Sequence, residues 1–200
     1  MGGLFLFFVS CLHIIIGSGK RGITLEKKYP AAYEAYLYEF HASRDYFECH
    51  ELLEEYWKVH PGDPQSETWV GLIQLAVSSY HHRRNNFRGA LLMMLQSRQR
   101  LTAGRLDELG LDGEAVCALI MKRITAIEAG EPFVDFNLPI IDEALLARGL
   151  QRAEHEGIRW AAASRDEDEL IHRHKLRDRS DVIAARAEAA SRRKLPPSAL

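Results

Sequence analysis

Residues 45–60, with the sequence DYFECHELLEEYWKVH, decide the fold class of this chain. On a helical wheel, one face collects the aromatic and aliphatic side chains, which are Tyr46, Cys49, Leu52, Leu53, Tyr56 and Trp57. Asp45, or Ser43 just before it, can cap the first turn, and Pro61 and Gly62 follow the last turn. The stretch therefore predicts an amphipathic helix over residues 46–59 that packs one face against a core.

The same helical periodicity recurs on both sides of this stretch, whereas the alternation typical of strands persists nowhere. Ser66 and Asp142 are the expected caps of two later helices, and residues 133–139 are expected to form an extended packing loop. The further helices are expected over residues 31–42, 66–84, 87–106, 114–129, 142–156 and 166–194. The fold class is therefore all-α, a compact helical bundle of antiparallel hairpins with a charged helical extension at the C-terminus.

A faint internal repeat supports the hairpins. Residues 45–49 (DYFEC) resemble residues 86–90 (NFRGA), about 41 positions further along. Each copy places a polar turn, an aromatic residue and then a small residue at the start of a helix. Two copies are too few for a solenoid, so we expect two similar hairpins in one bundle.

The composition indicates one globular domain with additional terminal segments. The chain has 200 residues, 46% of them hydrophobic. We expect a hydrophobic N-terminal segment over residues 1–24, the helical bundle over 25–158 and a C-terminal helical extension over 159–200. The formal net charge is −2 and both signs are interspersed, which is not typical of a general nucleic-acid binder.

The N-terminal segment allows three interpretations. Residues 4–16 form an almost unbroken apolar run that is too short for a membrane span, which needs about 20 residues. The run fits the core of a signal peptide, but the first basic residues, Lys20 and Arg21, follow it rather than precede it. A later start of translation, a signal peptide or membrane anchor, and a genuine hydrophobic arm all remain open. Membrane contact or export is expected only if this run belongs to the mature protein.

The cysteines favour a reducing compartment. Cys11, Cys49 and Cys117 are odd in number, far apart and without metal or redox spacing. Cys49 and Cys117 lie on apolar stripes, where free cysteine acts as a small core residue. We therefore expect a cytoplasmic protein.

A dense polar constellation lies on the helix over residues 46–59. His50 and Glu54 are four residues apart and so lie one turn apart, where an imidazole and a carboxylate can bind a metal or move a proton. The pattern H-E-x-x-E lacks the second histidine of the zinc-protease motif, which excludes that class. The candidate polar cluster comprises Glu48, His50, Glu51, Glu54, Gln74, His81, His82 and Arg83.

The next helix contains WVGLIQLAVSSYHHRR, residues 69–84, and is apolar around most of its circumference. Gly71, Gln74, Ser78 and His82 share one narrow side. If the helix over residues 46–59 is the neighbour on that side, Gln74 and one histidine would meet His50 or a glutamate. Arg83 and Arg84 could pair with Glu51, Glu54 or Glu55.

Three interpretations of the constellation remain open at this point. The first is a set of structural hydrogen bonds and ion pairs. The second is a ligand or divalent-metal site with His50, Glu54 and His81 as ligands. The third is an acid/base active site.

A second charged stretch lies in the C-terminal extension, over residues 169–181. Its alternating charges are typical of a solvated or docking helix, and a phosphate or RNA contact is the alternative. The candidate partner-binding residues are His172, Arg173, His174, Arg177 and Arg179.

Several motifs together resemble a known family. They are FHASRDYFECHELLEEYW (residues 40–57), WVGLIQLAVSSYHHRRNNFRGA (residues 69–90), FNLP (residues 136–139) and HRHKLRDRSDVI (residues 172–183). The chain resembles the domain of unknown function 309, most strongly over residues 29–101, and its longer Bacillus-type members further on. The resemblance implies a compact, mostly helical bundle in bacteria and archaea and implies no activity. The family begins near Tyr29, so residues 1–24 depart from it.

Two functional hypotheses follow. The first is a helical binding or scaffold protein that captures a protein partner or itself, through the charged last helix or a groove beside Trp57 and Trp69. The second is a metal-dependent or acid/base hydrolase that uses His50, Glu51 and Glu54 together with His81 or His82.

Overall fold

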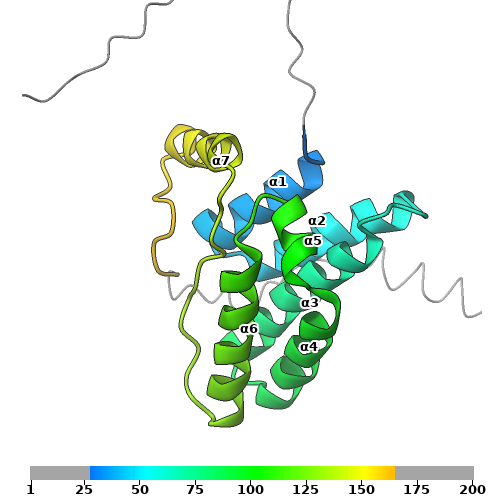
Figure 1. Ribbon diagram of the computed structural model, residues 1–200. Helices are drawn as coiled ribbons and strands as arrows, with labels where there is room; N and C mark the ends of the chain where they lie inside the picture. The colour runs from blue at the N-terminus through cyan, green and yellow to red at the C-terminus, as the bar shows by residue number, and fades with distance from the viewer. Residues whose placement is uncertain (1–27, 165–200) are drawn as a thin grey trace, which may run out of the picture.

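The central element of the fold is helix α3 (Ser66–Arg83), which α2 (Tyr46–Val59) and α4 (Phe87–Arg100) contact most extensively (Figure 1). The computed structural model describes residues 28–164, and this part is all-α, as the periodicity predicts. The remaining helices are α1 (Ala31–Tyr38), α5 (Ala103–Glu108), α6 (Gly113–Glu128) and α7 (Glu143–His155), with a π-helical turn (Glu39–Ser43) after α1. The apolar circumference of α3 explains its central position.

The internal repeat corresponds to two helix starts with the same geometry. Asp45 accepts a hydrogen bond from the Glu48 amide at 2.9 Å, and Asn86 accepts one from the Gly89 amide at 3.0 Å. The residue before each cap is left-handed, with φ 60° at Arg44 and 56° at Asn85. A left-handed residue reverses the chain and an Asp or Asn side chain then satisfies a free amide of the first turn.

Two expected helix boundaries were wrong, and tertiary contacts account for both. Ser66 is the first residue of α3 rather than its cap, and its hydroxyl accepts a hydrogen bond from the Trp57 indole at 2.7 Å. The helix expected over residues 87–106 divides into α4 and α5, because Leu101 is extended and its side chain is buried. That side chain packs on α3, where a Cβ added to Gly71 would lie 2.6 Å from Leu101 Cδ2.

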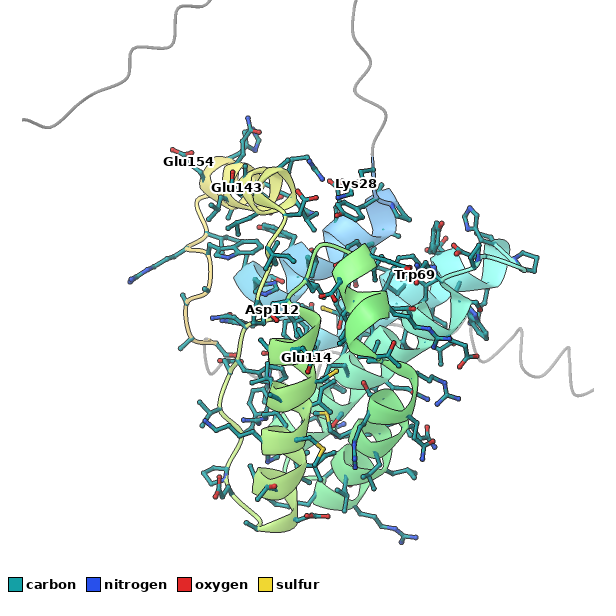
Figure 2. The ribbon with its side chains drawn as sticks, viewed as in Figure 1. Lys28, Trp69, Asp112, Glu114, Glu143 and Glu154 are labelled. Carbon is teal, nitrogen blue, oxygen red and sulfur yellow. The ribbon has the colours of Figure 1, made fainter. Side chains whose placement is uncertain are left out.

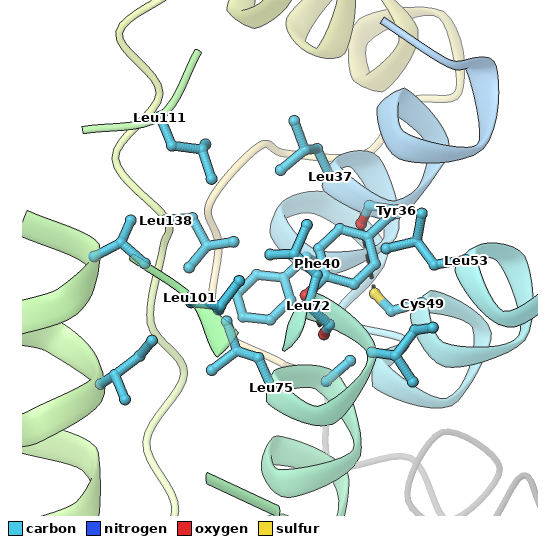
Figure 3. Close-up of a cluster of buried hydrophobic side chains, with 14 of the residues drawn as sticks. Tyr36, Leu37, Phe40, Cys49, Leu53, Leu72, Leu75, Leu101, Leu111 and Leu138 are labelled. Carbon is cyan, nitrogen blue, oxygen red and sulfur yellow. Dashed lines mark hydrogen bonds between the residues drawn. The ribbon is translucent and has the colours of Figure 1, made fainter. Parts of the chain in front are cut away.

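The core takes buried side chains from all seven α-helices of the described chain, and Figure 3 shows its centre around Tyr36, Phe40 and Leu72. The Tyr36 hydroxyl donates to the Leu72 carbonyl at 3.0 Å, and the Cys49 thiol donates to the Tyr36 carbonyl at 3.5 Å. Burial raises the pKa of both Tyr36 and Cys49, which keeps them neutral. Cys49 is therefore a core residue, as predicted.

An extended segment over residues 131–142 joins α6 to α7 and carries Phe136 and Leu138 into the core (Figure 1). This confirms the extended packing loop. Trp160, which follows α7, stacks on His41 with 4.9 Å between the ring centroids. The chain is thus still packed on the bundle beyond residue 158, where the extension was expected to begin.

Among residues 28–164, none of the helices has the length and apolarity that a membrane crossing requires. The apolar run over residues 4–16 and the helix expected over residues 166–194 lie outside the described residues.

Candidate functional site

Four glutamates of α2 gather around one surface hollow of about 240 Å³. We call this surface the acidic face of α2; it comprises Glu48, Glu51, Leu52, Glu54, Glu55 and Lys58. Its residues recur every three or four positions, so they project from the side of α2 opposite to the buried Cys49 and Leu53. Within residues 28–164, the lining of the hollow carries four carboxylates and one ammonium group, so this part of the surface is negatively charged.

His50 connects two of these carboxylates. Its Nδ1 lies 3.1 Å from Glu51 Oε1 and its Nε2 lies 3.3 Å from Glu54 Oε2. Glu54 also pairs with Lys58 at 3.0 Å. The His50 side chain is 23% exposed, and its ring lies 5.8 Å from that of Phe47. The imidazole is therefore held between two carboxylates at the edge of the bundle.

The three side chains can also approach a single ion. One ligand atom from each of His50, Glu51 and Glu54 lies within 4.8 Å of the others. Ligand atoms around a tetrahedral zinc lie about 3.4 Å apart, so modest side-chain rotations would suffice. Only one nitrogen of the His50 ring can bind such an ion. The glutamate that pairs with the other nitrogen would have to rotate away from the ring and toward the ion.

The expected contribution of α3 to this cluster was wrong for Gln74. Gln74 donates to Gln96 Oε1 at 2.9 Å and accepts from Arg100 at 3.2 Å, so it faces α4. Ser78 on the same side donates to the Ala90 carbonyl. Small residues on α3 allow a close neighbour on this side, but they do not specify which helix it is.

The two histidines of α3 also lie apart from His50 and its carboxylates. His82 is 1% exposed; its Nε2 lies 2.8 Å from the Glu131 carbonyl and its Nδ1 lies 3.1 Å from Arg123. His81 is half-buried and accepts a hydrogen bond from Asn86 at 3.1 Å. Burial lowers the pKa of both histidines, which favours neutral rings. Neither belongs to the group of ligand atoms around His50.

Arg83 lies at the C-terminal end of α3, against the first residue of α2. Its Nη2 donates to the Arg44 carbonyl at 2.6 Å, and its guanidinium lies 4.2 Å from the Tyr46 ring centroid. Its Nε and Nη1, and the Nε of Arg84, are buried and have no hydrogen-bond partner among the described residues. A buried donor without a partner is costly, which makes this end of α3 unusual.

The sequence analysis missed Arg44, which ties the FNLP stretch to the bundle. Its side chain is 2% exposed and donates to four oxygens: Phe40 O at 2.9 Å, Phe136 O at 2.9 Å, Asn137 Oδ1 at 2.8 Å and Ala162 O at 2.8 Å. Arg44 belongs to the motif RDYFE (residues 44–48), and its partners Phe136 and Asn137 belong to FNLP. A contact between these two motifs is the sequence-based hypothesis that would have identified Arg44.

His41 is a second buried residue that the sequence did not single out, because one of its partners, Leu138, lies far away along the chain. Its Nδ1 lies 2.7 Å from the Leu37 carbonyl, and its Nε2 accepts from the Leu138 amide at 3.0 Å. Burial lowers its pKa to about 4. His41 is therefore a neutral ring that connects α1 to the extended segment.

The candidate partner-binding residues His172, Arg173, His174, Arg177 and Arg179 lie outside the described residues. Trp69, beside which a groove was expected, is 1% exposed and donates to Asp63 at 3.0 Å. It is a core residue rather than the wall of an open groove.

Comparisons with known proteins identify the family of this chain. The model of the family called domain of unknown function (DUF309) matches residues 33–93, which include α2 and α3. The uncharacterized protein YpuF of Bacillus subtilis strain 168 is 44% identical over 169 residues, 83% of this chain and 97% of that protein. The chain therefore belongs to the DUF309 family. No solved structure matches it.

Proposed function

We propose that this protein is a binding protein, and that the acidic face of α2 binds a basic segment of a protein partner. One observation carries the proposal: Glu48, Glu51, Glu54 and Glu55 line one hollow in which Lys58 is the cation contributed by the described part of the chain. A Lys- or Arg-rich segment is the complementary ligand. Attraction between opposite charges speeds the association of two partners and favours one alignment of the segment on the face.

Partial burial strengthens such an interaction. The side chains of Glu51 and Glu54 are 38% and 34% exposed. Charges at a partly buried surface interact more strongly than charges in bulk water. Leu52 adds an apolar contact within the hollow, where the aliphatic stem of a lysine or arginine can lie.

Neutralising the face is expected to weaken binding of a basic ligand. In the full chain carrying Glu51→Gln, Glu54→Gln and Glu55→Gln, affinity for a labelled peptide of alternating lysine and alanine should fall about tenfold at low salt, because each exposed pair contributes at most about 1 kcal/mol. Fluorescence anisotropy measures the change, and glutamine preserves shape and helix propensity.

The matched control removes three exposed glutamates elsewhere, with Glu128→Gln, Glu143→Gln and Glu154→Gln. Figure 2 labels Glu143 and Glu154 on α7, which packs on α1. The control raises the net charge of the protein by the same three units as the test variant and should leave the affinity near that of the wild type. An equal loss of affinity in both variants would show that only the net charge of the protein matters. That result would contradict specific binding to the acidic face of α2.

A divalent-cation site at His50, Glu51 and Glu54 is the second candidate, favoured by the 4.8 Å spacing of their ligand atoms. It ranks second because each imidazole nitrogen already has a carboxylate partner and Glu54 also pairs with Lys58. A hydrolase that uses this cluster, with or without a metal, stays a prediction from the sequence.

Metal content tests the second candidate. If the site binds zinc or manganese, elemental mass spectrometry on full chain purified without chelator or metal-affinity resin should find about one equivalent. His50→Ala should lose the metal without unfolding, because the side chain is only partly buried. The exposed His155→Ala serves as control. Metal bound equally by all three proteins would exclude His50 as a ligand.

The cytoplasm is the proposed location, since Cys49 and Cys117 are free thiols. The proposed partner is a protein, or a second copy of this chain, rather than a nucleic acid, because a negatively charged face repels phosphates. A membrane partner is proposed only for the case in which residues 4–16 are part of the mature protein.

A further inference from the structure

We propose that residues 166–179 of this chain dock in cis along α2, with their acidic run beside Arg83 and Arg84 and their basic stretch on the acidic face of α2. The segment would then occupy the surface to which a basic partner is proposed to bind. This inference rests on the proposed function for the identity of that surface and adds its regulation by the chain itself.

The described chain ends beside the first turn of α2. The Ser164 amide donates to Asp135 Oδ2 at 2.6 Å, and the Tyr46 hydroxyl donates to Asp135 Oδ1 at 2.8 Å. Tyr46 is the first residue of α2, and the Arg83 guanidinium lies 4.2 Å from its ring centroid. Asp135 thus fixes the position of Ser164, where the described chain ends, beside the first turn of α2.

The first residues after this point have the charge that Arg83 and Arg84 require. Residues 166–169 read DEDE and follow Ser164 by two to five positions. Nε and Nη1 of Arg83 and Nε of Arg84 are buried donors without a partner in the described part of the chain. Carboxylates satisfy guanidinium donors better than water does, since both partners are charged.

The next residues have the charge that the acidic face requires. Residues 172–179 read HRHKLRDR, with four Lys or Arg, two His and one Asp. At the rise of the helix that the sequence predicts, they span about 12 Å, and residues 48–55 of α2 span about 12 Å. The eight residues from Ser164 to His172 can reach about 27 Å when extended, more than the full length of α2, which is about 21 Å.

The order of the charges fixes the direction of docking. Arg83 lies against the first residue of α2 and Arg84 follows it in the chain, whereas three of the four glutamates, Glu51, Glu54 and Glu55, lie beyond the first turn of α2. The described chain ends at that same end of α2, and the sequence that follows contains first acids and then bases. It therefore matches both sites when it runs in the same direction as α2, and the reverse direction would place acids against acids.

Limited trypsin digestion of the full chain tests the docking. Cleavage after Arg173, Lys175 and Arg177, followed by mass spectrometry, should be at least fivefold faster in the Glu51→Gln/Glu54→Gln/Glu55→Gln variant than in the wild type. The Glu128→Gln/Glu143→Gln/Glu154→Gln control should be cleaved at the wild-type rate. Equal rates in all three proteins would overturn the proposal.

A second measurement does not depend on proteolysis. A carbodiimide joins Lys175 to a glutamate of α2 by an amide bond only when the two side chains are in contact, and a mixture of ¹⁵N-labelled and unlabelled protein distinguishes one chain from two. Links within one chain support docking in cis. Links found exclusively between two chains would overturn docking in cis and show that a second copy of the chain occupies the acidic face. The absence of any link from Lys175 to α2 would also overturn the proposal.

Binding of the lysine–alanine peptide separates this inference from the proposed function. The full chain carrying Lys175→Glu and Arg177→Glu should bind the peptide at least fivefold more tightly than the wild type, because its own segment no longer competes. Equal binding would overturn the docking and leave the proposed function standing. Binding by neither protein would contradict the proposed function, and digestion and cross-linking would still decide the docking.

Discussion

Replacing Arg44 with methionine is expected to lower the free energy of unfolding by about 3–5 kcal/mol, because four oxygens, two of them in buried hydrogen bonds and two in partly buried ones, lose a charged donor at once. The oxygens come from the π-helical turn after α1, the FNLP stretch and the segment after α7. Methionine fills a similar volume but cannot donate, so the carbonyls of Phe40 and Phe136 stay buried and lose this donor. Urea unfolding followed by circular dichroism measures the loss.

The matched control is Arg98→Met, at an exposed position of α4, which should change the free energy of unfolding by less than about 0.5 kcal/mol. Arg44→Gly loses the same hydrogen bonds but relieves the left-handed backbone at φ 60°, so it should be about 1 kcal/mol less damaging than Arg44→Ala. A loss below about 1 kcal/mol in the methionine variant would show that the Arg44 side chain does not tie these segments together.

Acidification is expected to destabilise the protein through His41. Its folded-state pKa is about 4, against an ordinary value of 6.5, so between these values the unfolded chain binds a proton that the folded chain does not. The free energy of unfolding should therefore fall as the pH is lowered from 6.5 to 4. This histidine alone contributes about 3 kcal/mol to the fall.

The His41→Gln variant isolates this effect. Other groups with shifted pKa values, such as His82 and Asp135, are present in both proteins and cancel in the difference. Urea unfolding at pH 7 and pH 4 should show that the wild type loses about 3 kcal/mol more than the variant. The exposed His155→Gln should retain the wild-type slope. Identical slopes for wild type and His41→Gln would mean that the ring is protonated in the folded state.

The sequence of α2 predicted its own structure and part of its site. Its amphipathic pattern and the Asp45 cap predicted the boundaries of the helix, since both signals lie within a few residues of each other. The i, i+4 spacing predicted that His50 meets Glu54, because helix geometry fixes that distance. The same argument could not assign Gln74, His81 or His82 to α2, because helical periodicity defines a face and not the helix that packs on it.

What the sequence by itself determined is therefore local: the all-α class, the helix starts at Asp45 and Asn86, the extended character of residues 133–139, and the acidic character of one side of α2. Only the tertiary structure decided that α4 ends at Arg100, that Gln74 faces α4, and that Arg44 and His41 bind the FNLP stretch. The physical reason is range: caps and periodicity act over one or two turns, whereas these contacts join residues up to about a hundred positions apart, and their geometry exists only after the core has packed.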